Sequence, residues 1–334
     1  MANKANDKNL QYWKIYALGG GLGHLQRSIA LSRRAIRKGH YVDILCNSRF
    51  SKFIPWNNEL KKSGSLTIID NQASIEMTSS RVLKWIMDDN FDQLIVDTLP
   101  RGITGELVDI VKSIQKPKTF IHRDLKQKYV EKYNLNEFIK SYNLIIIPGE
   151  KNPIKGLNKL PFCHTTEPWL IRDHNEIIDK DLARIKFGMS PSDKRYLAII
   201  PLTGDSEEEK FFRNIHLHLV DSVKNWAFKL ISPIPDKSDL CIWPIMELMN
   251  GVDLIIGAGG YNTVSESRAT KTPLLGKPLD RIYDIQKGRL QNDQMFMNVE
   301  EIIKCLPKFE RNSRSDLYVN GTYKSVELIE SLLI

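Results

Sequence analysis

Residues 252–267 read VDLIIGAGGYNTVSES. The apolar run at 254–256 is typical of a parallel strand buried on both faces, and the glycines after it let backbone amides approach a ligand closely. A helix beginning after Gly260 would offer its free amides and positive dipole end to an anion such as phosphate. Glu266 lies about one turn further in, where a carboxylate could accept hydrogen bonds from hydroxyl groups. Taken alone, the stretch is equally consistent with a strand, turn and helix that bind no ligand.

A second glycine loop, GGGLGH, occupies residues 19–24. We expect a strand at 14–18 before it, a helix at 24–38 after it and a second strand at 41–46. Together these elements form a β-α-β unit whose glycine loop lies at the carboxyl end of the first strand. Open α/β sheets bind their ligands at that edge.

The rest of the chain continues to alternate short apolar runs with helical stretches, which predicts two doubly wound α/β domains. The first series has expected strands at 66–69, 94–96, 119–121 and 144–147 and helices at 103–114 and 129–141. The second has expected strands at 196–200, 227–231, 254–256 and 274–275 and helices at 207–220, 245–250, 262–269 and 298–305. Two such domains, each with a glycine turn at a strand's carboxyl end, would place a ligand site in the cleft between them.

Domain boundaries follow from the same pattern. The N-terminal domain is expected over residues 1–160 and the C-terminal domain over 176–317. Residues 161–175 belong to a proline-containing passage with little periodicity, so we expect a linker there. The last segment, 318–334, carries apolar residues at helical spacing and should pack as a helix on a domain surface.

The composition is that of an ordinary globular protein, with 334 residues of which 42% are hydrophobic. No apolar run reaches the roughly 18 residues of a membrane span, and the polar N-terminus lacks the apolar core of a signal peptide. We therefore expect a cytoplasmic protein. The four cysteines are scattered without a CxxC pair, which suits a reducing compartment and argues against a structural zinc site.

The formal charge of +8 points to a polyanionic partner. Nucleic acid is not expected, because neither a recognition motif nor an aromatic stacking pattern accompanies the basic residues. A basic cluster on the first expected helix is either a solvated charged face or a peripheral contact with the anionic inner face of a membrane. Its members are Arg27, Arg33, Arg34, Arg37 and Lys38.

Four motifs follow one another across nearly the whole chain. The loops GGGLGH at 19–24 and GGYNTVSE at 259–266 resemble bacterial GT-B glycosyltransferases of the family 28 type, which include the enzyme that adds N-acetylglucosamine to lipid I. VDTLPRG at 96–102 with GEL at 105–107, and RDL at 123–125, resemble a group of predicted bacterial glycosyltransferases. The resemblance implies the GT-B fold, in which two Rossmann-like domains enclose a cleft. It also implies an N-terminal acceptor domain and a C-terminal nucleotide-sugar domain.

The resemblance further implies donor contacts in the C-terminal domain. Glu266 would bind the ribose hydroxyls, and backbone groups near Ile242 or Trp243 would hold uracil. For Trp243, an ordinary core aromatic is an equal alternative. The turn at Gly204 would contact the donor phosphates or be no more than a turn. The diphosphate would lie on Gly259, Gly260, Asn262 and Thr263.

His24 is the first candidate for acceptor chemistry, because it closes the N-terminal glycine loop facing the cleft. An imidazole with a pKa of about 6.5 can act as a general base or donate to a phosphate. The alternative is a helix-capping histidine that touches only backbone. Asp97 ends an expected strand beside the same cleft. It could be the base, with His24 positioning the substrate, or it could cap a helix starting near Arg101.

The acceptor loop and the donor sugar leave further alternatives open. The acceptor or its phosphate would meet the loop at Gly21 and Gly23 and the guanidinium of Arg123, unless Arg123 forms only a salt bridge at a strand end. DRIY at 280–283 stands where the peptidoglycan enzyme has aspartate, arginine and two glutamines, and those glutamines contact the donor sugar. The sugar contacts would then fall to Asp284 or Gln286.

These features predict an enzyme that moves a sugar from a UDP-sugar to a hydroxyl of a small-molecule, lipid-linked or protein acceptor. We expect inversion with base assistance, and we expect neither a metal nor another cofactor. Two alternatives keep the same fold: hydrolysis of the nucleotide sugar, and non-catalytic binding of it. Both would use the same glycine loops.

Overall fold

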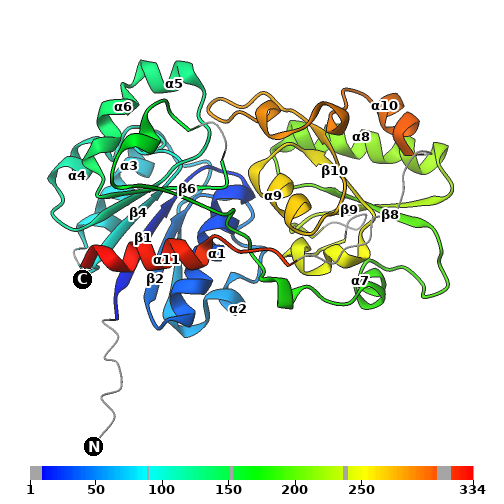
Figure 1. Cartoon of the computed structure of the whole chain (residues 1–334), viewed down its shortest axis with the longest axis horizontal. Coiled ribbons are helices and arrows are strands. Elements are labelled where there is room, and N and C mark those ends of the chain that lie inside the picture. The colour runs from blue at the N-terminus through cyan, green and yellow to red at the C-terminus, as the bar shows by residue number, and fades with distance from the viewer. Residues whose placement is uncertain (1–9, 89, 151–152, 236–239, 307–316, 334) are drawn as a thin grey trace, which may run out of the picture.

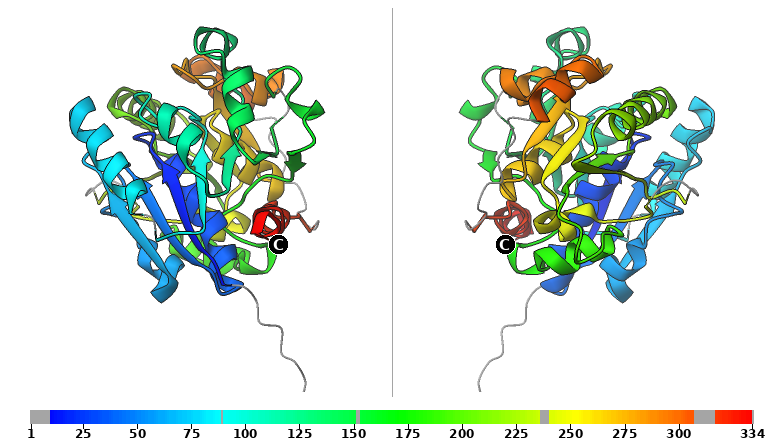
Figure 2. Two further views of the ribbon diagram at one scale, coloured as in Figure 1. Left: turned by 90° about the vertical axis from the view of Figure 1, so that its left-hand side faces the viewer. Right: turned by 90° about the vertical axis from the view of Figure 1, so that its right-hand side faces the viewer.

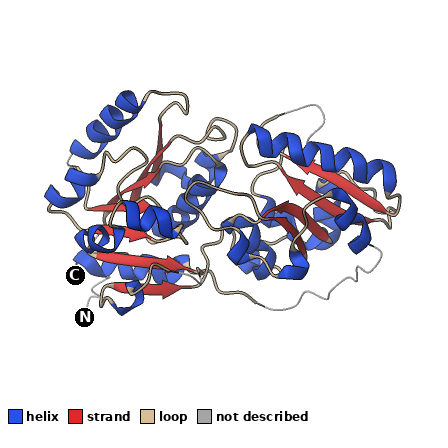
Figure 3. Ribbon diagram, turned by 90° about the horizontal axis from the view of Figure 1, so that it is seen from above, coloured by secondary structure: helices blue, strands red, loops and turns tan. Residues whose placement is uncertain are grey.

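The structure is a computed structural model that describes residues 10–88, 90–150, 153–235, 240–306 and 317–333. Two lobes lie side by side, each built on a parallel sheet with helices packed on it (Figure 1). Seen from above, the two sheets occupy separate lobes (Figure 3). The two-domain α/β architecture predicted from the sequence is confirmed.

The N-terminal lobe holds a seven-stranded sheet in the order β3-β2-β1-β4-β5-β6-β7, and every neighbouring pair is parallel. The order reverses between β1 and β4, so the loops after these two strands share the switch point where such sheets bind ligands. The strands are β1 (Tyr12–Ala17), β2 (Tyr41–Cys46), β3 (Gly64–Ile68), β4 (Gln93–Asp97), β5 (Lys118–Ile121), β6 (Leu144–Pro148) and β7 (Cys163–Thr166). The helices are α1 (Leu22–Arg37), α2 (Trp56–Leu60), α3 (Ile75–Met87), α4 (Val108–Ser113), α5 (Gln127–Lys132) and α6 (Leu135–Phe138).

The C-terminal lobe holds a four-stranded parallel sheet in the order β11-β10-β8-β9. Its order reverses between β8 and β10, the strands that end near Gly204 and Gly259. The strands are β8 (Tyr196–Pro201), β9 (Trp226–Ile231), β10 (Leu254–Ala258) and β11 (Leu274–Lys277). The helices are α7 (Lys180–Lys186), α8 (Ser206–Ser222), α9 (Tyr261–Ala269) and α10 (Val299–Cys305), together with a 3-10 helix at Ile245–Gly251.

Each sheet separates two apolar clusters, because successive strand side chains point to opposite faces. In β1, Trp13 and Ile15 enter one cluster, whereas Tyr16 enters the other. In β10, Ile255 and Ile256 divide in the same way between the two clusters of the C-terminal lobe. Central parallel strands buried on both faces explain why their sequences read as continuous apolar runs.

The chain differs from the expected elements in several places, among them the unexpected short helices α2 and α7 and the division of the expected helix at 129–141 into α5 and α6. The expected linker at 161–175 contains β7, which extends the N-terminal sheet to Thr166. Since Thr166 is the only buried residue of β7, the sequence of this strand has no apolar pattern that predicts it. Helix α3 was not expected, because only four of its 13 residues are buried and its exposed face carries Met77, Leu83 and Met87 among polar residues.

The last helix, α11 (Thr322–Glu330), returns to the N-terminal lobe and contacts α1, β6 and β7 (Figure 1, Figure 2). Val326 and Ile329 are fully buried there, in the same cluster as β1. On the other side, the Glu330 carboxylate forms ion pairs with Lys38 and His40. Both apolar packing and ion pairing therefore hold α11 on this lobe.

The basic cluster on α1 does not form an open basic surface, because every member has a partner within the chain. A membrane contact through this cluster therefore has no support from the structure. No helix in the described ranges is long and apolar enough to cross a membrane. The pairs are Arg27 with Asp97, Arg33 with Glu59 and Glu176, Arg34 with the ring of Tyr323, Arg37 with Asp173 and Glu176, and Lys38 with Glu330.

Gly321, which begins α11, tests the docking of this helix. A Cβ atom there would lie 1.7 Å from the backbone oxygen of Glu167, so Gly321→Ala forces the backbone apart. We expect the free energy of unfolding to fall by about 1–3 kcal/mol, as in other overpacked sites. Gly257→Ala is the matched control, because its Cβ would meet nothing nearer than 3.7 Å. Equal denaturant midpoints for the two variants would contradict the described docking.

Candidate functional site

The N-terminal glycine loop joins β1 to α1 and is fixed by one side chain. Asn47 Oδ1 accepts hydrogen bonds from the backbone N–H groups of Gly19 (2.8 Å) and Gly20 (2.9 Å). A Cβ atom at Gly19 would lie 2.1 Å from Cδ2 of His24, so the imidazole rests directly on this glycine. Gly20 has a φ of +71°, a conformation that favours glycine. These constraints place the His24 ring at the sheet's switch point.

His24 and Asp97 meet there as a hydrogen-bonded pair. The distance from His24 Nδ1 to Asp97 Oδ2 is 2.6 Å, and the His24 side chain keeps 21% of its surface exposed. The capping alternatives for both residues are wrong. Helix α1 begins at Leu22, so His24 lies within its first turn, and α4 begins at Val108, far from Asp97. The pair joins the ends of β1 and β4, the adjacent strands of the switch point.

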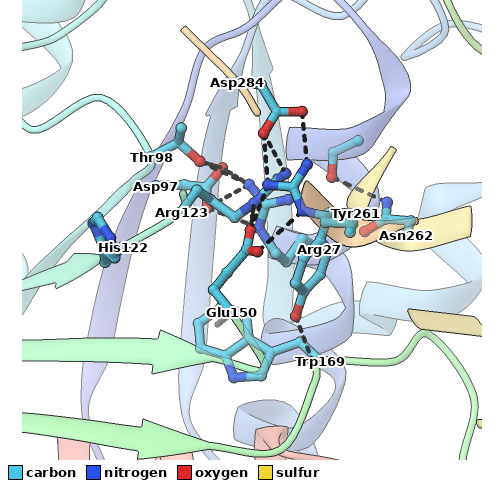
Figure 4. A network of polar contacts seen from close by, with 12 residues as sticks. Arg27, Asp97, Thr98, His122, Arg123, Glu150, Trp169, Tyr261, Asn262 and Asp284 are labelled. Carbon is cyan, nitrogen blue, oxygen red and sulfur yellow. Dashed lines mark hydrogen bonds and ion pairs between the residues drawn. The ribbon is translucent and has the colours of Figure 1, made fainter. Parts of the chain in front are cut away.

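Arg27 binds the other side of Asp97 (Figure 4). Its Nε and Nη2 atoms donate to Asp97 Oδ1 at 2.9 and 2.8 Å, and Nη2 also donates to Thr98 Oγ1 at 2.9 Å. Thr98 has a φ of +65°, a strained conformation for a β-branched residue that costs roughly 1–3 kcal/mol. Burial alone would raise the pKa of Asp97, but Arg27 and His24 hold it well below its usual range. A carboxylate so stabilised is a weak base.

The facing element in the C-terminal lobe is the glycine turn between β10 and α9. A Cβ atom at Gly259 would lie 2.9 Å from Leu290, whereas one at Gly260 would meet nothing within 4 Å. Gly260 caps α9 without a side-chain hydrogen bond to the first-turn amides. Asn262 Nδ2 donates to the backbone oxygen of Gly23 at 3.3 Å, so the two glycine loops are in direct contact.

The neighbouring glycines of these loops also face the opposite lobe or their own turn. A Cβ at Gly21 would lie 3.9 Å from the Thr203 backbone oxygen, across the interface. The Thr263 methyl group lies against Gly257 within the turn itself, 3.9 Å from the position of a Cβ. The prediction that the two glycine loops, at 19–24 and 257–263, lie together between the lobes is therefore confirmed.

Glu266 is buried in α9, and its carboxylate is already engaged. Gln26 Nε2, from α1 of the other lobe, donates to Glu266 Oε1 at 2.6 Å, while Gln26 Oε1 accepts from Trp243 Nε1 at 3.1 Å. Burial raises the pKa of the Glu266 carboxyl to about 8, with Arg172 and Gln26 opposing the shift. Gln26 thus joins the two residues predicted to hold ribose and uracil. Ile242 packs on the apolar cluster of the C-terminal lobe.

Gly204 lies where the N-terminus of α8 is occupied by the chain's own carboxylates. A Cβ there would lie 1.9 Å from Glu208 Oε2. Asp205 caps α8 by accepting from the Glu208 N–H at 2.9 Å, and Arg281 pairs with both carboxylates. Because a donor phosphate at Gly204 would meet these negative charges, the structure disfavours the predicted contact.

The two residues predicted to reach the donor sugar, Asp284 and Gln286, both bind other groups of the chain. Gln286 is buried, and its side-chain oxygen accepts from the Leu279 N–H at 3.1 Å, which shapes the loop rather than facing a ligand. Asp284 forms ion pairs with Arg123 at 3.2 Å and Arg289 at 2.6 Å. Arg123 therefore forms the salt bridge that was one of its two sequence alternatives. Neither predicted sugar contact is available in this state.

Four residues of the site were missed. Arg27 had a usable signal, since it lies three positions after His24 and hence on the same helix face. Glu150 had a weaker one, because it follows β6 as Arg123 follows β5. Gln26 and Arg289 had none, because Glu266 and Glu150, their partners across the interface, are distant in sequence. Glu150 accepts from Arg123 Nε at 2.6 Å and from Arg289 Nη2 at 2.7 Å.

The lobes are closed on each other at this site. The interface cavity lined by Glu150, Tyr261 and Arg289 measures about 10 Å³, which is barely the volume one water requires. A cavity of about 610 Å³ lies at the amino ends of β10 and β11, away from both glycine loops. Within the described ranges, no three His, Cys, Asp or Glu side chains cluster as metal ligands. The cavity between Glu150, Tyr261 and Arg289 is therefore too small for a nucleotide in this state.

Comparison with solved structures shows that the chain has the GT-B fold of glycosyltransferases. The calicheamicin glycosyltransferase CalG4 aligns at 13% identity with a TM-score of 0.56, covering 97% of this chain and 98% of that one. Anabaena HepE, in complex with UDP and glucose, aligns at 9% identity with a TM-score of 0.53, covering 96% of this chain and 95% of that one. The UDP-N-acetylglucosamine 2-epimerase of Rickettsia bellii aligns at 9% identity with a TM-score of 0.57, covering 97% of this chain and 95% of that one.

Sequence comparison does not assign the chain to a family. No protein-family model matches the chain, and a sequence search of curated proteins gives no match. At these identities the structural similarity establishes the fold alone. The matched epimerase shows that this fold is not confined to glycosyl transfer.

The raised pKa of Glu266 makes stability depend on pH. The folded chain keeps this proton between about pH 4.5 and 8, where the unfolded chain has lost it, so the free energy of unfolding falls as pH rises through that window. We expect Glu266→Gln to remove this fall, which has a slope of up to about 1.4 kcal/mol per pH unit. Urea denaturation from pH 5 to 8.5 measures it. Glu327→Gln, at a side chain 57% exposed, is the control and should keep the wild-type slope. Parallel pH profiles of wild type and Glu266→Gln would contradict the account.

Proposed function

We propose that this chain transfers a sugar from a nucleoside diphosphate sugar, with UDP as the nucleotide, to the hydroxyl of an acceptor. The observation that carries the proposal is the His24–Asp97 pair at one switch point, in contact through Asn262 and Gly23 with the glycine turn of the other lobe. One side supplies a base and the other a helix N-terminus. Glycosyl transfer needs both at one place.

In the proposed reaction, His24 removes the acceptor's proton while the hydroxyl oxygen attacks the anomeric carbon. Asp97 accepts from the His24 Nδ1–H, which leaves Nε2 free to take the proton and stabilises the imidazolium that forms. The departing diphosphate would lie on the amides that begin α9, near Gly260, Asn262 and Thr263, where the helix dipole stabilises negative charge. Such a single displacement inverts the anomeric carbon. It needs no metal, because the helix end and hydrogen bonds neutralise the leaving group.

Uridine specificity rests on the segment around Ile242 and Trp243 and on Glu266. On opening, Gln26 would leave Glu266 and Trp243, which frees a carboxylate for the ribose hydroxyls and an indole beside the base. Neighbouring structures support this nucleotide, since HepE was solved with UDP and glucose and a plant glycosyltransferase, UGT89C1, with UDP-L-rhamnose. The rhamnosyltransferase SpnG was solved with spinosyn aglycone, which supports a hydroxyl-bearing small molecule as one class of acceptor. Within the GT-B group, we propose the family 28 type from the two glycine loops.

A second candidate is hydrolysis of the nucleotide sugar, with water in place of the acceptor. One observation favours keeping it: the similarity to a nucleotide-sugar epimerase. Hydrolysis would use the same His24 base. It differs in requiring no acceptor.

His24 and Asp97 are tested by UDP release from a panel of UDP-sugars, with and without sugar, phenol and lipid-linked acceptors. We expect release to depend on an acceptor and His24→Ala to lower kcat by about 10²–10⁴-fold, as for other lost general bases. Asp97→Asn should also lower it. His218→Ala, an exposed histidine bonded to Asn214, is the matched control and should leave the rate unchanged.

Two outcomes would revise the proposal. Equal UDP release without any acceptor would make the chain a hydrolase. Unchanged turnover in both His24→Ala and Asp97→Asn would remove the catalytic assignment. The melting temperature of each variant is measured alongside, because Asp97→Asn leaves the buried Arg27 without its carboxylate.

A further inference from the structure

Asp284 lies between two buried guanidinium groups that come from different lobes. Its carboxylate accepts from Arg289 Nη1 at 3.0 Å and Nη2 at 2.6 Å, and from Arg123 Nη2 at 3.2 Å (Figure 4). The paired contact with Arg289 has the planar geometry in which guanidinium groups bind carboxylates and phosphates. Asp284 therefore fills a place shaped for an oxyanion.

The segment that carries Asp284 is an exposed loop resting on the other lobe. Ile282 is 79% exposed, and the Asp280 side chain is 94% exposed. The loop reaches the N-terminal lobe through the Lys126 N–H, which donates to the Tyr283 backbone oxygen at 2.8 Å, and through the ring of Tyr283 on Tyr129. In Figure 1 this orange segment bridges the two lobes near α5. The Asp284 backbone also pairs with Leu125, so it is the exposed side of the loop, and with it the Asp284 carboxylate, that can exchange partners more easily than Glu150, which follows the central part of the sheet at β6.

The cluster around Asp284 is balanced in charge and continuous with the His24–Asp97 pair. The guanidinium carbons of Arg27 and Arg123 lie 5.2 and 4.5 Å from the centre of one ring, that of Tyr261. In its ion pairs, three cations (Arg27, Arg123 and Arg289) face three anions (Asp97, Glu150 and Asp284). Asp124 and Arg268, which line the adjoining cavity, add one charge of each sign. Replacing the Asp284 carboxylate by one singly charged oxyanion keeps this balance, whereas leaving the place empty would bury an uncompensated charge.

One hydrogen-bond donor in the cluster also lacks an acceptor. Arg27 is 1% exposed, and its buried Nη1 has no partner within the part of the chain that the structure describes. His122 Nδ1, beside Arg123 and Glu150, also lacks a partner among the described residues. Because buried polar atoms without partners are costly, the cluster in this state is not fully satisfied by the chain's own groups.

We propose that Arg123 and Arg289 form a subsite for a carboxylate or phosphate group of the acceptor, and that Asp284 occupies this subsite in the closed state. The proposal rests on the proposed function and names its substrate class: an acceptor with a singly charged oxyanion near the reacting hydroxyl. The donor's diphosphate is assigned to the N-terminus of α9. Arg123 instead follows β5, the strand beside β4, so this anion would bind at the sheet edge that carries Asp97.

Binding of dimethyl phosphate and of acetate to the full chain tests the subsite, with calorimetry as the readout and no nucleotide present. Asp284→Asn keeps the shape of the side chain but removes its charge, so we expect it to bind at least one probe about tenfold more tightly than wild type, as for a charge-assisted hydrogen bond. The probe that gains distinguishes phosphate from carboxylate. Asp280→Asn is the matched control, because it removes one charge from the same loop and should leave both affinities unchanged.

Two further arms make the outcome decisive. Adding Arg289→Met to Asp284→Asn should abolish the gain, whereas binding at the N-terminus of α9 would survive it. In wild type, a saturating concentration of the probe should speed hydrogen exchange at the Lys126 amide, which donates to the Tyr283 backbone oxygen. If Asp284→Asn does not fold, this measurement on wild type decides whether the subsite exists. Equal affinities in the two single variants with unchanged Lys126 exchange would overturn the subsite. Because no arm uses a nucleotide or turnover, failure of the subsite and failure of the transferase proposal are separate results.

Discussion

The ion pair between Arg27 and Asp97 is the interaction on which the site depends. Asp97 ends β4 fully buried, and without Arg27 its charge would be uncompensated. Arg27 contacts both carboxylate oxygens and so fixes the group with Oδ2 on His24. The strained φ of Thr98 is tolerated because Thr98 also accepts from Arg27. One arginine on α1 thus determines the geometry of the histidine three residues before it.

Closure of the lobes uses groups that stand where ligand groups are proposed to bind. The Gln26 amide meets Glu266 as a ribose hydroxyl would, and the Asp284 carboxylate meets two arginines as an acceptor oxyanion would. Each substitute keeps a buried polar group satisfied while no ligand is bound. Opening for a donor and an acceptor is then an exchange of partners rather than a net loss of hydrogen bonds.

The sequence predicted the fold well and the site only in part, for physical reasons. Buried parallel strands such as β2 and β10 carry long apolar runs, and the glycine loops follow from the strand-to-helix turns, so these elements and the joining of His24 to the α9 turn were predictable. The polar edge strand β7 has no such run. Side-chain partners across the interface, such as Arg289 with Glu150, depend on tertiary packing that no local pattern records. Gln286 was predicted to take over the sugar contact of the family's glutamines, which Ile282 and Tyr283 replace, yet its side-chain oxygen accepts from the Leu279 backbone.

The central claim is that a uridine nucleotide binds between the two glycine loops, and binding by the wild-type chain tests it most directly. Thermal melting with UDP, GDP, ADP and dTDP is the measurement, since a ligand that binds only the folded state raises the melting temperature. The account predicts a rise with UDP, equivalent to about 2.7 kcal/mol at a concentration 100 times Kd, and smaller rises with the purine nucleotides. A rise with GDP or ADP and none with UDP would contradict it.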